Sequence, residues 1–408
     1  MKLVRETDTL LLAATLLTVA LGITTIYSAT FHSESLMWMK QMRFALVAVV
    51  IALAIVYLPN KILYGLSYPL YLLGLMSLVA VQVWGTGEGA ARWLALGALR
   101  LQPSEFAKIA TIITLARFIS DRSTDEINNA RSFLGALLIT LIPMGLVARQ
   151  PDLGTAIAFG AVLFPMLYWA GMRPLFIFCI ISPLLSVIFS FEELWQTITP
   201  FVFASFVIFS SAAIHFLLTR LWVTITMFSV NLSAGLITRY LWDQLHSYQK
   251  TRILTFLNRE NDPLGGGWNI IQSKIAIGSG GLSGRGFLEG TQTRYEFLPA
   301  AHTDFVFSVI GEELGFIGAL MVLALFIFLI WRGLYIGFIA KNRFYSLVAI
   351  GLSAMLTFHV FVNVGMTIGV MPVTGLPLPF MSYGGSSLLA NFTAIGLLLH
   401  IYTYRHEY

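Results

Sequence analysis

The sequence predicts an all-α protein that crosses a membrane many times. Only 11% of its 408 residues are charged and 57% are hydrophobic, whereas a soluble domain carries about 25% charged residues. Apolar runs long enough for a helix to cross a bilayer, about 20 residues each, recur along the chain. So few charges cannot keep a protein of this length dispersed in water. The composition therefore excludes an ordinary soluble enzyme, and we expect lipid to cover much of the apolar surface.

Twelve apolar runs are the predicted membrane spans. They cover residues 9–30, 44–59, 63–84, 105–120, 133–149, 153–171, 174–191, 197–218, 220–240, 305–331, 345–369 and 385–403. The first run is longer than the apolar core of a signal peptide, which has about 7–15 residues, so we interpret it as an uncleaved span. Cys179 is the only cysteine, which excludes a disulfide framework and a cysteine-based metal site.

The distribution of Lys and Arg predicts that both chain ends face the cytoplasm. With the N-terminus inside, the cytoplasmic loops hold more of these residues than the outer loops, as is typical of membrane proteins. This orientation gives three parts. Residues 1–240 form about nine N-terminal spans, residues 241–304 form a large extracytoplasmic loop, and residues 305–408 form about three C-terminal spans.

Ionisable residues inside or at the ends of spans are costly, so they mark sites or paired networks. Glu105 and Lys108 stand three residues apart at a predicted helix start, and Arg92 precedes them. Residues at this spacing share a helical face. The pair is either a structural ion pair that fixes the helix end or part of a polar lining for an anionic head group.

Asp152 also stands beside a span, directly before the apolar run that starts at residue 153. An aspartate in this position is a favoured helix N-cap. Alternatively, an outward-facing carboxylate beside Arg149 positions a cation or a lysine. The sequence leaves both interpretations open.

A glycine-rich stretch at residues 278–286 lies between Lys274 and Arg285. Its backbone N–H groups are suited to cradle phosphate oxygens, and the two cations strengthen that interpretation. The alternative is a tight turn at the membrane surface that needs glycine only for its backbone.

Asp304 stands at the start of a predicted helix, where aspartate often serves as a cap. His302 is the only other titratable residue close enough in the sequence to influence it, and Glu312 and Glu313 follow about two turns later. We expect residues 305–313 to lie at the membrane boundary, with their acids facing protein or an outer cavity.

Residues 369–385 contain three prolines within eight positions, at Pro372, Pro377 and Pro379, which is incompatible with a regular helix. Irregular backbone is tolerated at membrane depth where it lines a cavity. The segment is therefore either a re-entrant or rim element beside the same outer site or a plain connecting loop.

Taken together, these segments resemble the SEDS family of bacterial shape, elongation, division and sporulation proteins over most of the chain. Within the family the sequence is closer to the RodA group than to the FtsW group, because Gly290-Thr291-Gln292 precedes Phe297-Leu298-Pro299. The other motifs that carry the resemblance are Gln102-Pro103-Ser104-Glu105, Gln150-Pro151-Asp152-Leu153-Gly154-Thr155, Gln272-Ser273-Lys274-Ile275-Ala276-Ile277-Gly278-Ser279-Gly280-Gly281, His302-Thr303-Asp304-Phe305, Glu312-Glu313-Leu314-Gly315 and Ser382-Tyr383-Gly384-Gly385-Ser386.

The resemblance implies a peptidoglycan glycosyltransferase that polymerises lipid II on the outer face of the bacterial cytoplasmic (inner) membrane, during cell elongation and cell-shape maintenance. It implies a class B penicillin-binding protein as crosslinking partner, the elongation machinery and membrane lipid as further partners, and no nucleic acid. By position, Asp304 matches the family's catalytic aspartate. The residues that match the polar lining of its cavity are Arg92, Glu105, Lys108 and Asp152.

Two features depart from the family pattern. The family has ten spans, whereas two extra apolar runs around residues 197–240 bring this chain to about twelve. Ala300 stands after Leu298-Pro299, where the family usually has an acidic residue. That neighbouring acid is therefore dispensable or replaced here.

The implied reaction converts an α-linked donor into a β-linked glycan, so a single inverting displacement is the simplest hypothesis. It requires a base for the attacking hydroxyl and positive charge for the leaving pyrophosphate. Asp304 is the expected base. Candidates for the positive charge are Lys108, Arg92, Lys274 and Arg285, assisted by a divalent cation (Mg or Mn) at Asp152 or Glu105.

The competing hypothesis is a lipid II flippase, because a translocation pathway also needs charged residues inside a helical bundle. A flippase predicts charges along both halves of the bundle. The candidate residues gather on the outer side instead, which favours the enzyme.

Overall fold

The computed structural model describes residues 7–32, 35–86, 92–97, 99–192, 196–218, 220–244, 250, 254, 267–295 and 297–406. The chain divides into two compact units. The first comprises Met1–Ala170 and Asn269–Tyr408, and the second comprises Gly171–Trp268.

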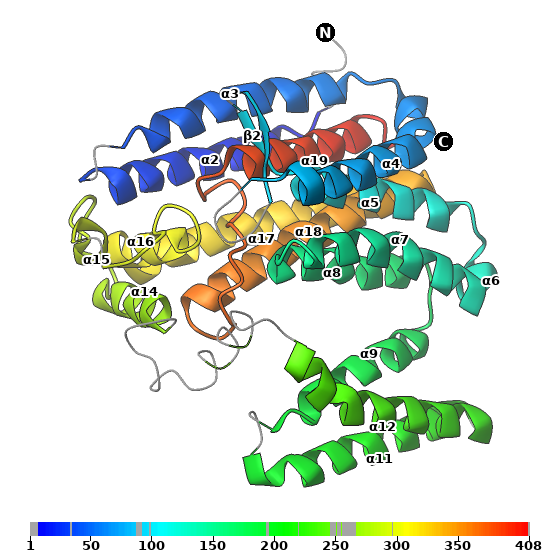
Figure 1. The fold of residues 1–408 in the computed structure, drawn as a ribbon. Coiled ribbons are helices and arrows are strands. Elements are labelled where there is room, and N and C mark those ends of the chain that lie inside the picture. Colours follow the sequence, from blue (N-terminus) through cyan, green and yellow to red (C-terminus); the bar gives the residue numbers. More distant parts are fainter. Residues whose placement is uncertain are drawn as a thin grey trace. The chain divides into compact units, whose positions relative to one another are not determined.

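The first unit is a bundle of long helices with one short hairpin (Figure 1). Before residue 171 its elements are α2 (Thr9–Thr30), α3 (Met37–Val56), α4 (Asn60–Trp84), β1 (Leu94–Leu96), β2 (Leu99–Leu101), α5 (Pro103–Ser120), α6 (Thr124–Ile127), α7 (Ala130–Ala148) and α8 (Leu153–Trp169). The strands β1 and β2 pair antiparallel. The later elements are α14 (Trp268–Ser279), α15 (Thr291–Arg294), α16 (Val306–Glu313), α17 (Gly315–Ile339), α18 (Arg343–Thr367) and α19 (Gly385–Thr403).

The second unit contains α9 (Pro174–Phe189), the 3₁₀ turn η1 (Gln196–Ile198), α11 (Thr199–Leu218) and α12 (Leu221–Gln244). A buried amide joins its three long helices. Asn231 accepts a hydrogen bond from Ser182 Oγ at 3.1 Å and donates one to Ser210 Oγ at 3.2 Å. Such hydrogen bonds hold helices together where lipid tails provide no hydrophobic driving force between them.

Each of the twelve predicted apolar runs lies on a helix of the structure, with the run at 305–331 divided between α16 and α17. Among the described residues, nine helices are long and apolar enough to cross a membrane, while α8 and α9 are shorter apolar helices. The multi-pass helical architecture is therefore confirmed. The count of about twelve spans stays a prediction, as do the division at residues 240 and 304 and the outward position of the loop between them. Within that loop, residues 245–249, 251–253, 255–266 and 296 lie outside the described part.

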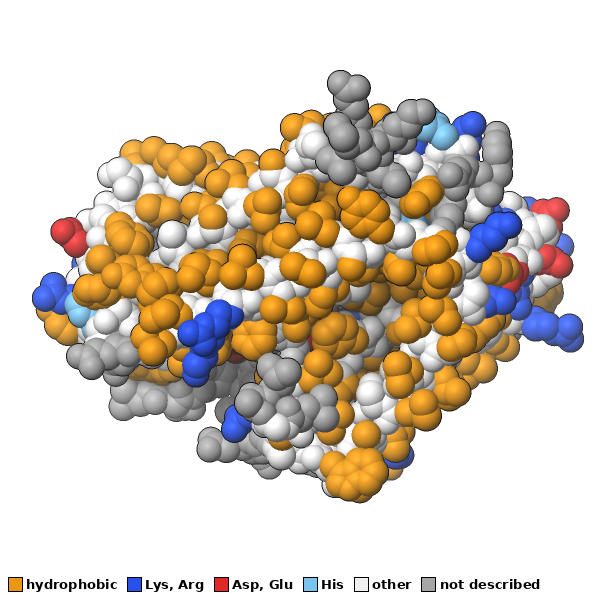
Figure 2. Space-filling model, turned by 90° about the horizontal axis from the view of Figure 1, so that it is seen from above, with side chains coloured by type: hydrophobic (Ala, Val, Ile, Leu, Met, Phe, Trp, Pro, Cys, Tyr) orange, Lys and Arg blue, Asp and Glu red, His pale blue; other side chains and the backbone are white. Residues whose placement is uncertain are grey.

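Two of the nine candidate spans form the core of the first unit. In the most apolar 18-residue stretch of α18 and of α19, 72% of the residues are buried, compared with 17–39% in the other seven helices. α18 packs against α5, α8, α16, α17 and α19 (Figure 1). Gly351 permits this packing, because a Cβ there would lie 2.6 Å from Ile112 of α5 and 2.8 Å from Met166 of α8. Hydrophobic side chains dominate the molecular face in Figure 2, as expected for a lipid-covered surface.

Polar contacts fix α2 at both of its ends. Asp8 caps α2 by accepting from Leu11 N at 3.1 Å, and its second oxygen accepts from Arg332 Nε of α17. At the other end, Ser28 donates to the buried carboxylate of Glu313. An apolar groove of about 810 Å³ lies between the two contacts, with Leu21 of α2 and Val322 of α17 among its lining residues.

We predict that Asp8→Ala lowers the free energy of unfolding by about 3 kcal/mol, because it removes the helix cap and leaves the Arg332 guanidinium without its partner. Denaturant unfolding of the purified protein in detergent measures this change. Asp8→Asn is the matched control, since its amide oxygen retains the cap, and a smaller loss is expected. Equal stability of wild type and Asp8→Ala would contradict the role of this contact.

Candidate functional site

The predicted site residues fall into three neighbouring groups and one separate group. The first three lie at the start of α5, at the start of α8 and in the turn before α16. The fourth lies at the far end of α16.

Glu105 and Lys108 form a buried ion pair at the start of α5. Pro103 occupies the first turn, where a missing N–H does no harm, and Glu105 follows in the same turn. Lys108 Nζ lies 2.9 Å from Glu105 Oε1, and the side chains are only 2% and 6% exposed. The predicted ion pair is therefore present, whereas a polar lining for an anionic head group stays a prediction. Because both charges are buried, each depends on the other for neutralisation.

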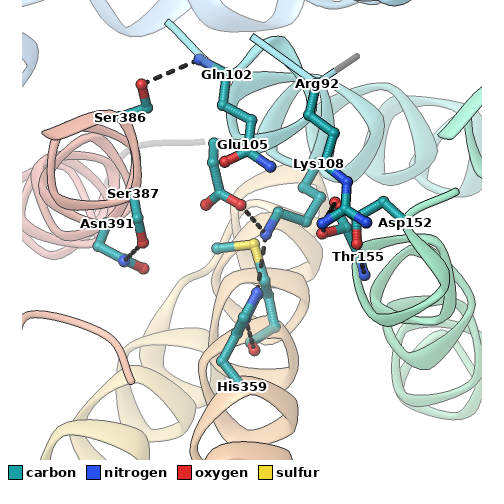
Figure 3. A network of polar contacts seen from close by, with 11 residues as sticks. Arg92, Gln102, Glu105, Lys108, Asp152, Thr155, His359, Ser386, Ser387 and Asn391 are labelled. Atoms are coloured by element: carbon teal, nitrogen blue, oxygen red, sulfur yellow. Dashed lines mark hydrogen bonds and ion pairs between the residues drawn. The ribbon is translucent and has the colours of Figure 1, made fainter. Parts of the chain in front are cut away.

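His359 of α18 is a second partner of Lys108, which the sequence interpretation missed. Its Nε2 lies 2.8 Å from Lys108 Nζ, and its Nδ1 lies 2.8 Å from the carbonyl oxygen of Met355 (Figure 3). The sequence feature that could have indicated this contact is the position of His359 within a predicted span, because ionisable residues inside spans mark sites by default. The contact joins α5 to α18 across 251 positions of sequence.

Asp152 is the N-cap of α8 and also faces Arg92. Its carboxylate accepts from the backbone N and the Oγ1 of Thr155, at 3.2 and 3.0 Å. Arg92 Nη1 lies 3.8 Å from Asp152 Oδ2, and the same guanidinium donates to the carbonyl of Pro151. The cap interpretation is confirmed, and Arg92 is the cation beside the carboxylate (Figure 3). About a quarter of the Arg92 side chain is exposed, so this group borders open space.

Asp304 lies in the turn that precedes α16 and is partly exposed. The N-cap residue of that helix is Phe305, whose side chain makes no capping hydrogen bond. Asp304 therefore does not occupy the N-cap position, which is one residue later than predicted. Asn363 of α18 donates to the carbonyl oxygen of Asp304 at 3.0 Å and also contacts that of Leu376 at 2.8 Å, so one amide holds this turn.

The proline-rich segment between α18 and α19 connects the Asp304 turn to the start of α8. Residues 372–379 have no regular secondary structure, as predicted. Gly375 has φ +75°, and a Cβ there would lie 3.5 Å from Asp304 Oδ2. On the other side, a Cβ at Gly154 of α8 would lie 2.9 Å from the carbonyl oxygen of Thr374. The segment is therefore in close contact with Asp304 and with the first turn of α8, which Asp152 caps.

Burial lowers the pKa of the His302 imidazole below its ordinary value, which favours the neutral form of the ring beside the Asp304 turn. Its ring contacts that of Tyr383, with centroids 6.0 Å apart, and its carbonyl oxygen accepts from Tyr383 N. Its contacts therefore tie the Asp304 turn to the segment before α19.

Arg285 belongs to a separate group at the opposite end of α16 from Asp304, about 12 Å along the helix. Its backbone N donates to the carbonyl of Glu312, and its guanidinium donates to Thr291 Oγ1 at 3.0 Å. The buried Glu312 carboxylate in turn accepts from the backbone N and Oγ1 of Thr291, at 2.7 and 2.9 Å. Glu312 thus organises this loop, a role that the sequence interpretation missed.

The glycine-rich stretch packs tightly on the same end of α16. A Cβ at Gly280 would lie 2.0 Å from the carbonyl oxygen of Gly311, and one at Gly284 would lie 2.0 Å from that of Glu313. Glycine is therefore needed for close packing, as the tight-turn interpretation predicts. Lys274 is exposed on α14, and its neighbour Ser273 attaches this helix to α16 and α18. Binding of phosphate by this stretch stays a prediction.

The carboxylates predicted to hold a divalent cation have other partners. Glu105 pairs with Lys108, and Asp152 pairs with Thr155 and Arg92. Within the described part of the chain, no three residues among His, Cys, Asp and Glu are grouped to hold a metal ion. These donors do not fit a resident metal centre.

Comparison with known proteins gives consistent matches over the chain. The model of the FtsW, RodA and SpoVE family of cell cycle proteins matches residues 8–203 and 191–407. The peptidoglycan glycosyltransferase MrdB of Escherichia coli K12 is 38% identical over 382 residues, which cover 93% of this chain and 89% of that protein.

Two solved structures are also similar. One belongs to a peptidoglycan synthase complex that coordinates polymerization and crosslinking, with a TM-score of 0.73, 31% identity, and coverage of 98% of this chain and 99% of that chain. The crystal structure of the Thermus thermophilus rod shape determining protein RodA has a TM-score of 0.63 and 27% identity, and 98% of each chain is covered.

We predict that Glu105 and Lys108 are energetically coupled. Lys108→Met alone should lower the free energy of unfolding by about 3 kcal/mol, because it leaves a buried carboxylate unpaired. The double variant Glu105→Gln/Lys108→Met should lose less than the sum of the two single variants, which denaturant unfolding measures. Additive losses would show that the pair does not contribute as a unit.

Proposed function

Because this chain belongs to the family of FtsW, RodA and SpoVE and is a peptidoglycan glycosyltransferase, we propose that it polymerises lipid II with Asp304 as general base. The observation that carries this proposal is that α18 contacts both the turn that contains Asp304 and the side chain of Lys108. Asn363 holds the Asp304 turn, and His359 contacts Lys108. These two residues stand four positions apart, on one helical face. A carboxylate and an ammonium are thus attached to adjacent turns of one buried helix.

Asp304 has the features that the base requires. It is partly exposed, and the backbone of its turn is fixed by Asn363 and by the hydrogen bond from its own N to the carbonyl of Ala300 at 3.1 Å. The carboxylate accepts the proton of the GlcNAc 4-hydroxyl as that oxygen attacks C1 of the MurNAc donor. The C1 bond to pyrophosphate breaks with inversion, and undecaprenyl pyrophosphate leaves with the electron pair.

The leaving pyrophosphate carries charge that must be neutralised, and Lys108 and Arg92 are the best-placed cations. Both belong to the groups connected through α18 and the proline-rich segment. Lys274 and Arg285 are exposed and lie on other elements, so we assign them to attraction of the anionic head group.

A divalent cation, Mg or Mn, would have to share the oxygens of the substrate's pyrophosphate, because Glu105 and Asp152 are engaged by protein partners. Such an ion would neutralise phosphate charge. We assign no reaction step to it.

The lipid part of the substrate needs an apolar path along the protein. The groove between α2 and α17 has about 810 Å³ and an apolar lining, with Glu313 at its margin. The lining includes two threonines, Thr24 and Thr25, whose hydroxyls donate to the carbonyl of Leu21. These hydroxyls therefore have hydrogen-bond partners within the protein and need none from a ligand in the groove. We propose that it accepts part of a polyprenyl chain.

The protein is a multi-pass membrane protein, and we propose that the site faces the outside of the cytoplasmic membrane. We also propose a class B penicillin-binding protein as the crosslinking partner. The likeness to a solved synthase complex that coordinates polymerization and crosslinking supports this assignment.

We predict that Asp304→Ala lowers the rate of glycan polymerisation at least 100-fold, since a general base contributes about 10²–10⁴-fold. The assay uses the purified protein with its penicillin-binding protein, lipid II and a divalent cation. Asp125→Ala, an exposed site in α6, is the matched control and should polymerise normally.

Wild-type polymerisation by Asp304→Ala would reject Asp304 as the base. If wild-type protein makes no polymer but moves lipid II across a vesicle bilayer, the flippase is the correct function instead.

The outward orientation predicts a labelling pattern for single cysteines in a Cys179→Ser background. Ser283→Cys should react with a membrane-impermeant maleimide in intact spheroplasts, whereas Thr124→Cys should react only after lysis. Both positions are exposed in the structure, so accessibility reports the side of the membrane. The opposite pattern would place the site in the cytoplasm.

A further inference from the structure

We propose that His359 is a positioning residue that orients the Lys108 ammonium toward the leaving pyrophosphate. This role rests on the proposed polymerisation reaction and names a residue that the proposed chemistry does not include. The observations are the two contacts of the imidazole, the burial of both side chains and the placement of His359 on α18.

The contacts of His359 determine which ring nitrogen carries the proton. Nδ1 lies 2.8 Å from the carbonyl oxygen of Met355, which can only accept, so Nδ1 carries the hydrogen. Nε2 of a neutral ring then has a lone pair, and it lies 2.8 Å from Lys108 Nζ. The imidazole therefore accepts a hydrogen bond from the ammonium. A doubly protonated ring would have no acceptor for Lys108 and would place two positive charges in contact.

The ammonium of Lys108 has three donors, and two of them are directed by protein acceptors. One points to Glu105 Oε1 at 2.9 Å and one to His359 Nε2 at 2.8 Å (Figure 3). These two hydrogen bonds hold the ammonium against rotation about its carbon–nitrogen bond, Cε–Nζ, and so hold the direction of the third N–H. With Glu105 alone, one hydrogen bond would hold that rotation, and the N–H that now points to His359 Nε2 would lack its acceptor. His359 therefore supplies a second constraint on the orientation of the ammonium, and we assign the remaining donor to the leaving pyrophosphate.

The placement of His359 also relates Lys108 to Asp304. Asn363, one turn later on α18, holds the backbone of the Asp304 turn, and a rise of four residues is about 6 Å. A rigid helix therefore fixes the spacing between the base and the cation for the leaving group.

The test compares His359→Leu with His359→Gln. Leucine provides no acceptor, whereas the glutamine amide oxygen can accept from Lys108. We expect kcat for polymerisation to fall about 10- to 100-fold in His359→Leu, as for loss of a hydrogen bond to a charged group, with little change in KM. His359→Gln should recover most of the loss. His400→Leu, which removes another buried histidine, on α19, should retain the wild-type kcat.

A wild-type kcat in His359→Leu would overturn the proposal. Equal losses in the leucine and glutamine variants would also overturn it, because filling of the core would then explain the effect.

A second measurement does not depend on activity. In ¹⁵N-histidine NMR of the membrane-embedded protein, the signals of His359 are assigned by their absence from His359→Gln. We expect a protonated Nδ1 and an unprotonated Nε2, and we expect the Nε2 shift to change in Lys108→Met. A protonated Nε2 in the wild type would reject the hydrogen bond. Expected NMR shifts in a protein that makes no polymer would reject the proposed function while leaving the Lys108 contact intact.

Discussion

Pairing of buried charge is the constraint on which this structure depends. Lipid cannot solvate an ionisable side chain, so each one that is buried in the bundle needs a partner within the protein. The pair of Glu105 and Lys108 and the contact of Asp8 with Arg332 both join or fix helices in this way. Asp8 and Arg332 lie on different elements, and Lys108 also contacts His359 of α18, so satisfying these groups also sets how the helices pack.

α18 is the element where these requirements meet. Its apolar side chains form the core, and one face carries His359 and Asn363. The first contacts Lys108 of α5, and the second holds the turn of Asp304. The proline-rich segment beside this face has no helical hydrogen bonds. Such irregular backbone is tolerated in a membrane protein where other parts of the protein cover it. The groups proposed for catalysis thus belong to one rigid frame.

Local features of the sequence predicted much of this arrangement. Residues 9–30 and 385–403 were identified as helices with the bounds that the structure gives, because apolar length is a local property. The ion pair of Glu105 and Lys108 was likewise predictable from its spacing of three. The contact of His359 with Lys108 was not, since it joins positions 251 residues apart. Asp304 does not occupy the predicted N-cap position because its helix begins later, after Phe305. Arg285, a predicted cation for the pyrophosphate, lies at the opposite end of α16 from Asp304.

A structure of the protein with its crosslinking partner and an uncleavable lipid II analogue tests the central claim most directly. The account predicts a pyrophosphate oxygen within about 2.7–3.2 Å of Lys108 Nζ, with the acceptor 4-hydroxyl at hydrogen-bond distance from the Asp304 carboxylate. His359 and Asn363 should retain their contacts. A pyrophosphate bound beside Arg285, at the opposite end of α16 and away from Lys108, would contradict the account.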